Sequence, residues 1–239
     1  MSMPVFSSKN IPGLFKAGLA LSFTIILYQT PDLCRHYDLA IGTIPFCIGL
    51  AGEIVIGFII GISAQLIFAG IQLGGQIIGF QMGLSIANIL DPLTSSQVSV
   101  TARFNDLMAM LIFLAVNAHY LFLRAVAKSF QILPPLGFQF TRSLMDKLIV
   151  LAGNMFVIAI RVAGPVMGVL LLVSVALGLI ARMVPQLNVF IVAMPLKIII
   201  GLFIMGVSAS LVASFFIGEF NELGHIILVL LRAAGAKSP

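Results

Sequence analysis

Residues 73–92 read LGGQIIGFQMGLSIANILDP and combine the apolar character of a membrane helix with a regular series of glycines. Glycine occurs at 75, 79 and 83. Residues four apart share one face of a helix, so these three positions predict a groove that a neighbouring backbone approaches closely. Small residues at this spacing are common in membrane bundles of many kinds. The polar side chains beside the glycines make the pattern more informative.

Amide side chains accompany the glycines. Gln76 and Gln81 lie within the same apolar run, and Asn88 follows near its end. An amide exposed to acyl chains leaves costly unsatisfied polar atoms, so these residues are expected to face other helices or water. The run then reaches Asp91-Pro92, where a charge precedes a residue that interrupts helices. We therefore expect a helix that packs against protein and ends at Asp91.

The composition identifies an integral membrane protein. The chain has 239 residues, of which 60% are hydrophobic and only 9% are charged, and its mean hydropathy is +1.17. Soluble domains carry about 25% charged residues. The net charge of +5 comes from basic residues scattered singly between apolar runs, a pattern that favours anchoring to lipid head groups and argues against nucleic-acid binding. We predict one all-α membrane domain over residues 1–239.

The longest charge-free window covers residues 54–90. As one helix it would reach roughly 55 Å, against a hydrocarbon core of about 30 Å. It is therefore expected to tilt, to fold back as a hairpin, or to continue beyond the lipid inside a protein assembly. The rest of the chain predicts a helix over 105–125, a loop over 126–146, a helix over 147–181 kinked at Gly164-Pro165, a turn at 182–186, a helix over 188–217 and a short amphipathic stretch in the tail 219–239.

Three charged residues, Glu53, Arg161 and Lys197, lie within long apolar runs. An isolated charge at the centre of a membrane helix costs at least about 2.5–3.5 kcal/mol, so partners or water are expected. The favoured interpretation is ion pairing that fixes an assembly, and a proton relay is the alternative. No metal-ligand spacing, phosphate loop or nucleophile–base arrangement is present in the sequence. We therefore expect no enzyme activity, no cofactor and no metal site.

The run GGQIIGFQMGLSIANILDP resembles the signature of the FliR family of flagellar biosynthesis proteins, subunits of the type III secretion export gate. Further matching residues follow in the same order along nearly the whole chain: Asn117-Ala118-His119, Ser129-Phe130, Pro134, Arg182, Pro185-Gln186, Asn188-Val189-Phe190, Pro195, Lys197 and Gly201. The structural turn that Pro185 predicts after Arg182 includes Pro185, Gln186 and Asn188. Family members usually begin with a further apolar helix, which this sequence is expected to lack, since it opens at the segment after it.

The resemblance implies a fold of long, bent helical hairpins in a hetero-oligomeric helical channel of the bacterial inner membrane, at the flagellar basal body and partly raised toward the periplasm. The implied partners are the FliP and FliQ subunits, with FlhB and FlhA nearby, membrane lipid, and unfolded flagellar proteins as substrates. The segment corresponding to 82–98 would enter the channel and help plug it. Its residues of interest are Met82, Leu84, Ile86, Asn88, Asp91 and Pro92.

The main alternative from the residues themselves is a secondary transporter for ions or small solutes. Such proteins use broken helices and charges near the membrane midplane. Gly164-Pro165 and Lys197 are compatible with that design, but no inverted repeat is visible. A structural and gating subunit of a protein-export channel is the preferred prediction.

Overall fold

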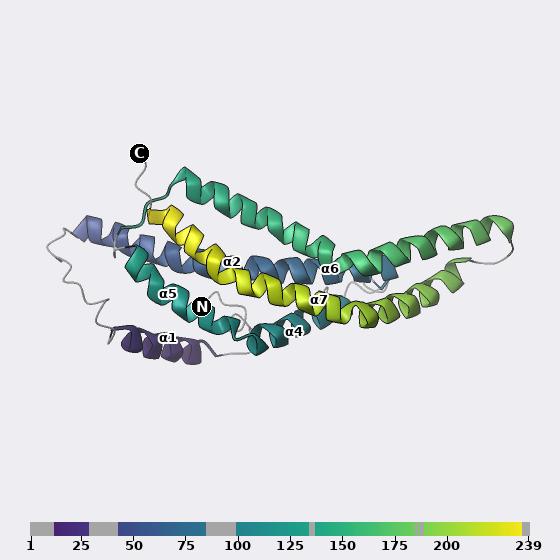
Figure 1. Ribbon diagram of the computed structural model, residues 1–239, viewed down its shortest axis with the longest axis horizontal. Helices are drawn as coiled ribbons and strands as arrows, with labels where there is room; N and C mark the ends of the chain where they lie inside the picture. Colours follow the sequence, from purple (N-terminus) through teal and green to yellow (C-terminus); the bar gives the residue numbers. More distant parts are fainter. Residues whose placement is uncertain are drawn as a thin grey trace. The chain divides into compact units, whose positions relative to one another are not determined.

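The computed structural model describes residues 12–28, 43–84, 99–133, 137–184, 186 and 189–235. Within these ranges every regular element is an α-helix (Figure 1), which confirms the predicted all-α class. The helices are α1 (Gly13–Tyr28), α2 (Thr43–Met82), α4 (Val100–Ala115), α5 (Ala118–Ile132), α6 (Arg142–Met183) and α7 (Val189–Gly235).

Three of the described helices are long and apolar enough to cross a membrane, which confirms an integral membrane protein. The spans are Phe46–Met82, Arg142–Met183 and Ile191–Gly235, with mean hydropathies of 2.4, 2.4 and 2.3. The pair α4 and α5 would add a fourth, broken span. At about 1.5 Å per residue, each of the three long spans would measure roughly 55–70 Å, about twice the hydrocarbon thickness.

Helix α2 corrects two expectations about residues 54–90. It runs without interruption from Thr43 to Met82, so the window does not fold back as a hairpin within its described part, and Glu53 lies inside the helix. It also ends before Asp91-Pro92. The physical reason is Gly83, which adopts φ 83° and closes the last turn. A left-handed residue directly after a helix is a stronger stop than a distant proline.

The loop predicted over 126–146 is too long, because α5 continues to Ile132 and α6 begins at Arg142. Its first residues belong to an amphipathic helix. Arg124 and Lys128 are exposed on α5, whereas Phe122 and Ala125 are buried. The connection between the two helices is much shorter than expected, and its residues 134–136 lie outside the described part.

The helix predicted over 105–125 is also wrong as a single element. Asn117 has φ 58° and ψ 30° and separates α4 from α5. Its N–H donates to the Leu114 carbonyl at 3.0 Å, and its own carbonyl accepts from Tyr120 N at 2.9 Å. Asparagine tolerates the left-handed conformation better than other non-glycine residues. A polar residue in an apolar run therefore marks a break rather than a surface position.

The predicted tail 219–239 is helical over most of its length, since α7 continues to Gly235. Its apolar residues Phe220, Leu223 and Ile227 are fully buried. Phe220 meets Phe113 edge-to-face, with ring centroids 5.3 Å apart. Helices α6 and α7 likewise continue through Pro165 and Pro195. The Gly164-Pro165 pair does not end its helix.

The described residues form two compact units. The first takes in the described parts of Met1–Leu66, Phe113–Ala152 and Glu219–Pro239, and the second comprises Ile67–Ile112 and Gly153–Gly218 within the same limits. In the first unit Thr141 joins two helix ends. Its hydroxyl donates to the Ala233 carbonyl near the end of α7 at 2.6 Å and accepts from Leu144 N at the start of α6 at 3.2 Å.

Candidate functional site

Helix α2 carries four closely packed glycines in the second unit, at positions 70, 74, 75 and 79. The first two face α6. A Cβ atom added at Gly70 would lie 2.6 Å from the Met155 carbonyl oxygen, and one at Gly74 would lie 2.9 Å from the Ala159 carbonyl oxygen. Carbon–oxygen contacts this short are not tolerated, so both positions exclude any side chain. The α2 backbone packs directly on α6, as glycines permit in membrane bundles.

Gly75 and Gly79 face the start of α4 instead. A Cβ at Gly75 would lie 2.5 Å from Ala102 Cα and 2.9 Å from Ala102 N. A Cβ at Gly79 would overlap Ser99 Oγ and lie 2.8 Å from Thr101 Oγ1. The glycines therefore allow α6 and α4 to pack closely on two adjacent faces of α2. The sequence pattern alone did not distinguish these two faces.

Two hydroxyl groups use the space that these glycines leave. Thr101 is 2% exposed, and its Oγ1 donates to the Gly75 carbonyl oxygen at 2.7 Å. Because that bond uses the single threonine proton, the 2.6 Å contact between Ser99 Oγ and Thr101 Oγ1 has serine as its donor. Sequence reasoning missed both residues. The available signal was a run of Ser and Thr directly before a helix, where such side chains often bond backbone groups.

Gly83 has a different role from the other glycines. Its N–H donates to the Phe80 carbonyl at 3.0 Å, and Leu84 N–H donates to the Gly79 carbonyl at 3.0 Å. With φ 83° at Gly83, these two bonds make a Schellman motif at the end of α2. Gly83 is needed here for its backbone conformation.

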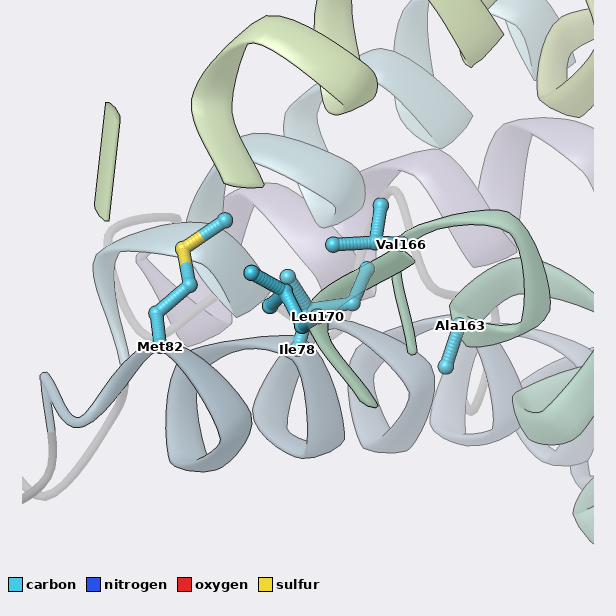
Figure 2. Packing of buried hydrophobic residues seen from close by; sticks show 5 residues of the cluster. All are labelled: Ile78, Met82, Ala163, Val166 and Leu170. Atoms are coloured by element: carbon cyan, nitrogen blue, oxygen red, sulfur yellow. The ribbon is translucent and has the colours of Figure 1, made fainter. Parts of the chain in front are cut away.

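Met82 and Leu84 flank that turn and belong to the apolar core of the second unit. Figure 2 shows Ile78 and Met82 rising from one face of α2 toward α6 residues Ala163, Val166 and Leu170. Met82 is 0% exposed. Its terminal methyl group occupies the space over Gly201 of α7, where a Cβ would overlap it. Leu84 packs against the same cluster.

The other candidate residues are half-buried, exposed or outside the described part of the chain. Gln76 and Gln81 are half-buried on α2, so their role in assembly stays a prediction. Ile86, Asn88, Asp91 and Pro92 lie outside the described residues, as do Pro185 and Asn188. Arg182 is exposed in the last turn of α6, and Gln186 lies in a turn.

The three charged candidates lie on three different helices. Arg161 is exposed, and its guanidinium lies 5.5 Å from the centre of the Phe215 ring, a cation–π contact between α6 and α7. Glu53 and Lys197 are half-buried on α2 and α7. Within the described ranges, no group of three or more His, Cys, Asp or Glu side chains is arranged to hold a metal ion.

The fold and the site together define an all-α integral membrane protein in which glycines of α2 pack closely on α6 and α4. The chain belongs to the bacterial export proteins, family 1, whose family model matches residues 1–223. It is 34% identical to the flagellar biosynthetic protein FliR of Bacillus subtilis (strain 168), over 89% of this chain and 82% of that protein. It is 32% identical to FliR of Escherichia coli (strain K12), over 94% of this chain and 85% of the relative. These comparisons confirm the resemblance to the FliR family.

Proposed function

We propose that this membrane protein is a structural and gating subunit of the flagellar type III export channel, which helps to form both the conduit and its plug. Membership of the bacterial export family supports the export role. The flagellar branch is supported by relatives named flagellar biosynthetic protein FliR, including one from Aquifex aeolicus (strain VF5) that is 26% identical over 100% of this chain.

The observation that carries the gating role is the fixing of both ends of segment 85–98 at one point on α2. On one side, Leu84 N–H is bonded to the Gly79 carbonyl at 3.0 Å. On the other side, Ser99 Oγ packs onto Gly79, where a side chain would overlap it. A segment held at both ends by the same helix can extend into a channel and be displaced without unfolding the helices. The two fixed ends therefore support a plug role for the segment between them.

The assembly role is supported by the apolar faces that this chain leaves uncovered. The most apolar window of α2 is 56% buried, against 33% for α6 and 11% for α7. Such faces need lipid or other helices. We assign them to FliP, FliQ, FlhB and lipid of the inner membrane, with FlhA nearby. Helices of about twice the bilayer thickness fit an assembly that is partly raised toward the periplasm. Glu53, Arg161 and Lys197 then supply charges for contacts between subunits.

Deleting residues 86–96 tests the gating role, because the deletion keeps Leu84 and Ser99 and therefore both anchors. The shortened chain should still co-purify with FliP and FliQ, and cells that carry it should show raised ion leakage across the inner membrane. Gly75→Leu is the matched assembly control, and it should abolish co-purification. Normal conductance with the shortened chain would refute the plug. A chain that is stable alone and binds a solute would refute the export subunit and favour a secondary transporter.

A further inference from the structure

A small, partly open cavity lies in the second unit, among α2, α4, α6 and α7. Its volume is about 10 Å³, and its apolar lining includes Ile78, Val162 and Val212. Two polar side chains also line it, Asn105 from α4 and Ser208 from α7. Asn105 is buried and Ser208 is half-buried. A buried polar side chain such as Asn105 needs hydrogen-bond partners, because unsatisfied polar groups are costly in a membrane bundle.

Asn105 has an unfulfilled donor at this cavity. The residue is 3% exposed, and its Nδ2 group finds no hydrogen-bond partner among the described residues. Ser208 is only weakly engaged, since its hydroxyl donates to the Met205 carbonyl at 3.4 Å. That distance is well beyond the usual 2.7–2.8 Å for such a bond, and the serine oxygen can still accept.

We propose that one ordered water molecule occupies this cavity, accepts a hydrogen bond from Asn105 Nδ2 and bonds the Ser208 hydroxyl. The size supports water, because a cavity needs about 10–15 Å³ to hold one molecule and a larger ligand does not fit. Water also suits either orientation of the amide, since it can donate to an oxygen as readily as it accepts from a nitrogen.

The water would connect α4 to α7 across an otherwise apolar interior. Polar contacts between helices help to hold membrane bundles together, where apolar burial gives little driving force. A bridge at Asn105 and Ser208 would therefore fix the register of α7 against α4. The inference is independent of the proposed export function, since it concerns contacts inside one unit of this chain.

A double-mutant cycle on the full chain in lipid nanodiscs tests the bridge through the midpoint of thermal unfolding. Asn105→Leu should lower the midpoint by about 3–6 °C and Ser208→Ala by about 2–3 °C. The double variant should lose no more than Asn105→Leu alone, because both changes break the same bridge. Ser214→Ala is the matched control on α7. Its hydroxyl also bonds a carbonyl one turn earlier, Leu211 at 2.8 Å, but it is exposed, and its removal should change little.

A dry cavity gives the opposite results. Asn105→Leu would then raise the unfolding midpoint by removing an unsatisfied amide, or the two single effects would add. Either outcome overturns the proposal. A high-resolution density map of the unmodified chain requires no variant. It therefore tests for the bridging water even if Asn105→Leu fails to fold. One density peak within hydrogen-bonding distance of Asn105 Nδ2 and Ser208 Oγ supports the bridge. An empty cavity, or one filled by a side chain of another subunit, refutes it.

Discussion

Adding a single methyl group to α2 should have opposite effects at Gly75 and Gly57, although both glycines lie inside the same helix. A Cβ at Gly75 would lie 2.5 Å from Ala102 Cα, whereas a Cβ at Gly57 would meet nothing within 4 Å. Carbon atoms pack best at about 3.5–4.0 Å, so Gly75→Ala forces a displacement of roughly 1 Å. The contacting atoms belong to the α4 backbone and cannot rotate away.

The expected magnitudes follow from two opposing terms. Alanine is favoured over glycine inside a helix by about 1 kcal/mol, and Gly57→Ala should gain up to that amount. Overpacking costs about 1–3 kcal/mol or more, so Gly75→Ala should be destabilised by about 2 kcal/mol after the same gain is subtracted. The difference between the variants is about 3 kcal/mol. For a chain of this size it corresponds to roughly 6–12 °C in the unfolding midpoint, measured on the purified protein in detergent.

Gly79 provides a rescue experiment that separates packing from other effects. The added methyl group of Gly79→Ala would overlap the Ser99 hydroxyl, a side-chain atom that can be removed. Ser99→Ala should therefore restore part of the stability lost in Gly79→Ala. It should not rescue Gly75→Ala, whose contact is with the Ala102 backbone. Equal midpoints for Gly75→Ala and Gly57→Ala, or equal rescue at both positions, would refute the packing argument.

Three further substitutions test separate contacts by thermal unfolding. Gly83→Ala should lower the free energy of unfolding by about 1–2 kcal/mol, because φ 83° is unfavourable for a residue with a Cβ. Gly83→Asn should lower it by less, and equal losses would contradict the backbone explanation. Thr141→Val should cost about 1–2 kcal/mol by removing the 2.6 Å bond to the Ala233 carbonyl, and Thr141→Ser should retain most of that stability. A double-mutant cycle of Arg161→Gln and Phe215→Leu should give a coupling of about 0.5–1 kcal/mol, and zero coupling would show that the cation–π contact contributes nothing.

The all-α class and the membrane environment followed from composition, because so few charges cannot cover a soluble fold. The glycine spacing predicted close packing on α2, and a Cβ atom at Gly75 or Gly79 would indeed lie too close to α4 or the residue before it. The assignment of faces did not follow from the spacing. Gly74 and Gly75 are neighbours in sequence yet face α6 and α4, respectively. Periodicity identifies a face that is poor in side chains, but only tertiary structure identifies the helix that fills it.

Helix boundaries were the weakest predictions, and each failure has a local physical cause. The loop predicted over 126–146 began too early, since α5 continues to Ile132 with Lys128 on its exposed face. Asn117 separates α4 from α5 because its backbone adopts a left-handed conformation. Whether the backbone adopts this conformation depends on the contacts at both helix ends. The bonds of Thr101 to Gly75 and of Thr141 to Ala233 join distant segments. No pattern within a short window contains such pairs.

The position where α2 ends determines which side chains belong to its packed face. Gly83 ends helix α2 at Met82, whose side chain is fully buried over Gly201. Met82 therefore packs within this chain, and its assignment to the proposed plug stays a prediction. A glycine that stops the helix and a methionine packed on α7 together fix the end of α2, which the sequence alone placed at Asp91.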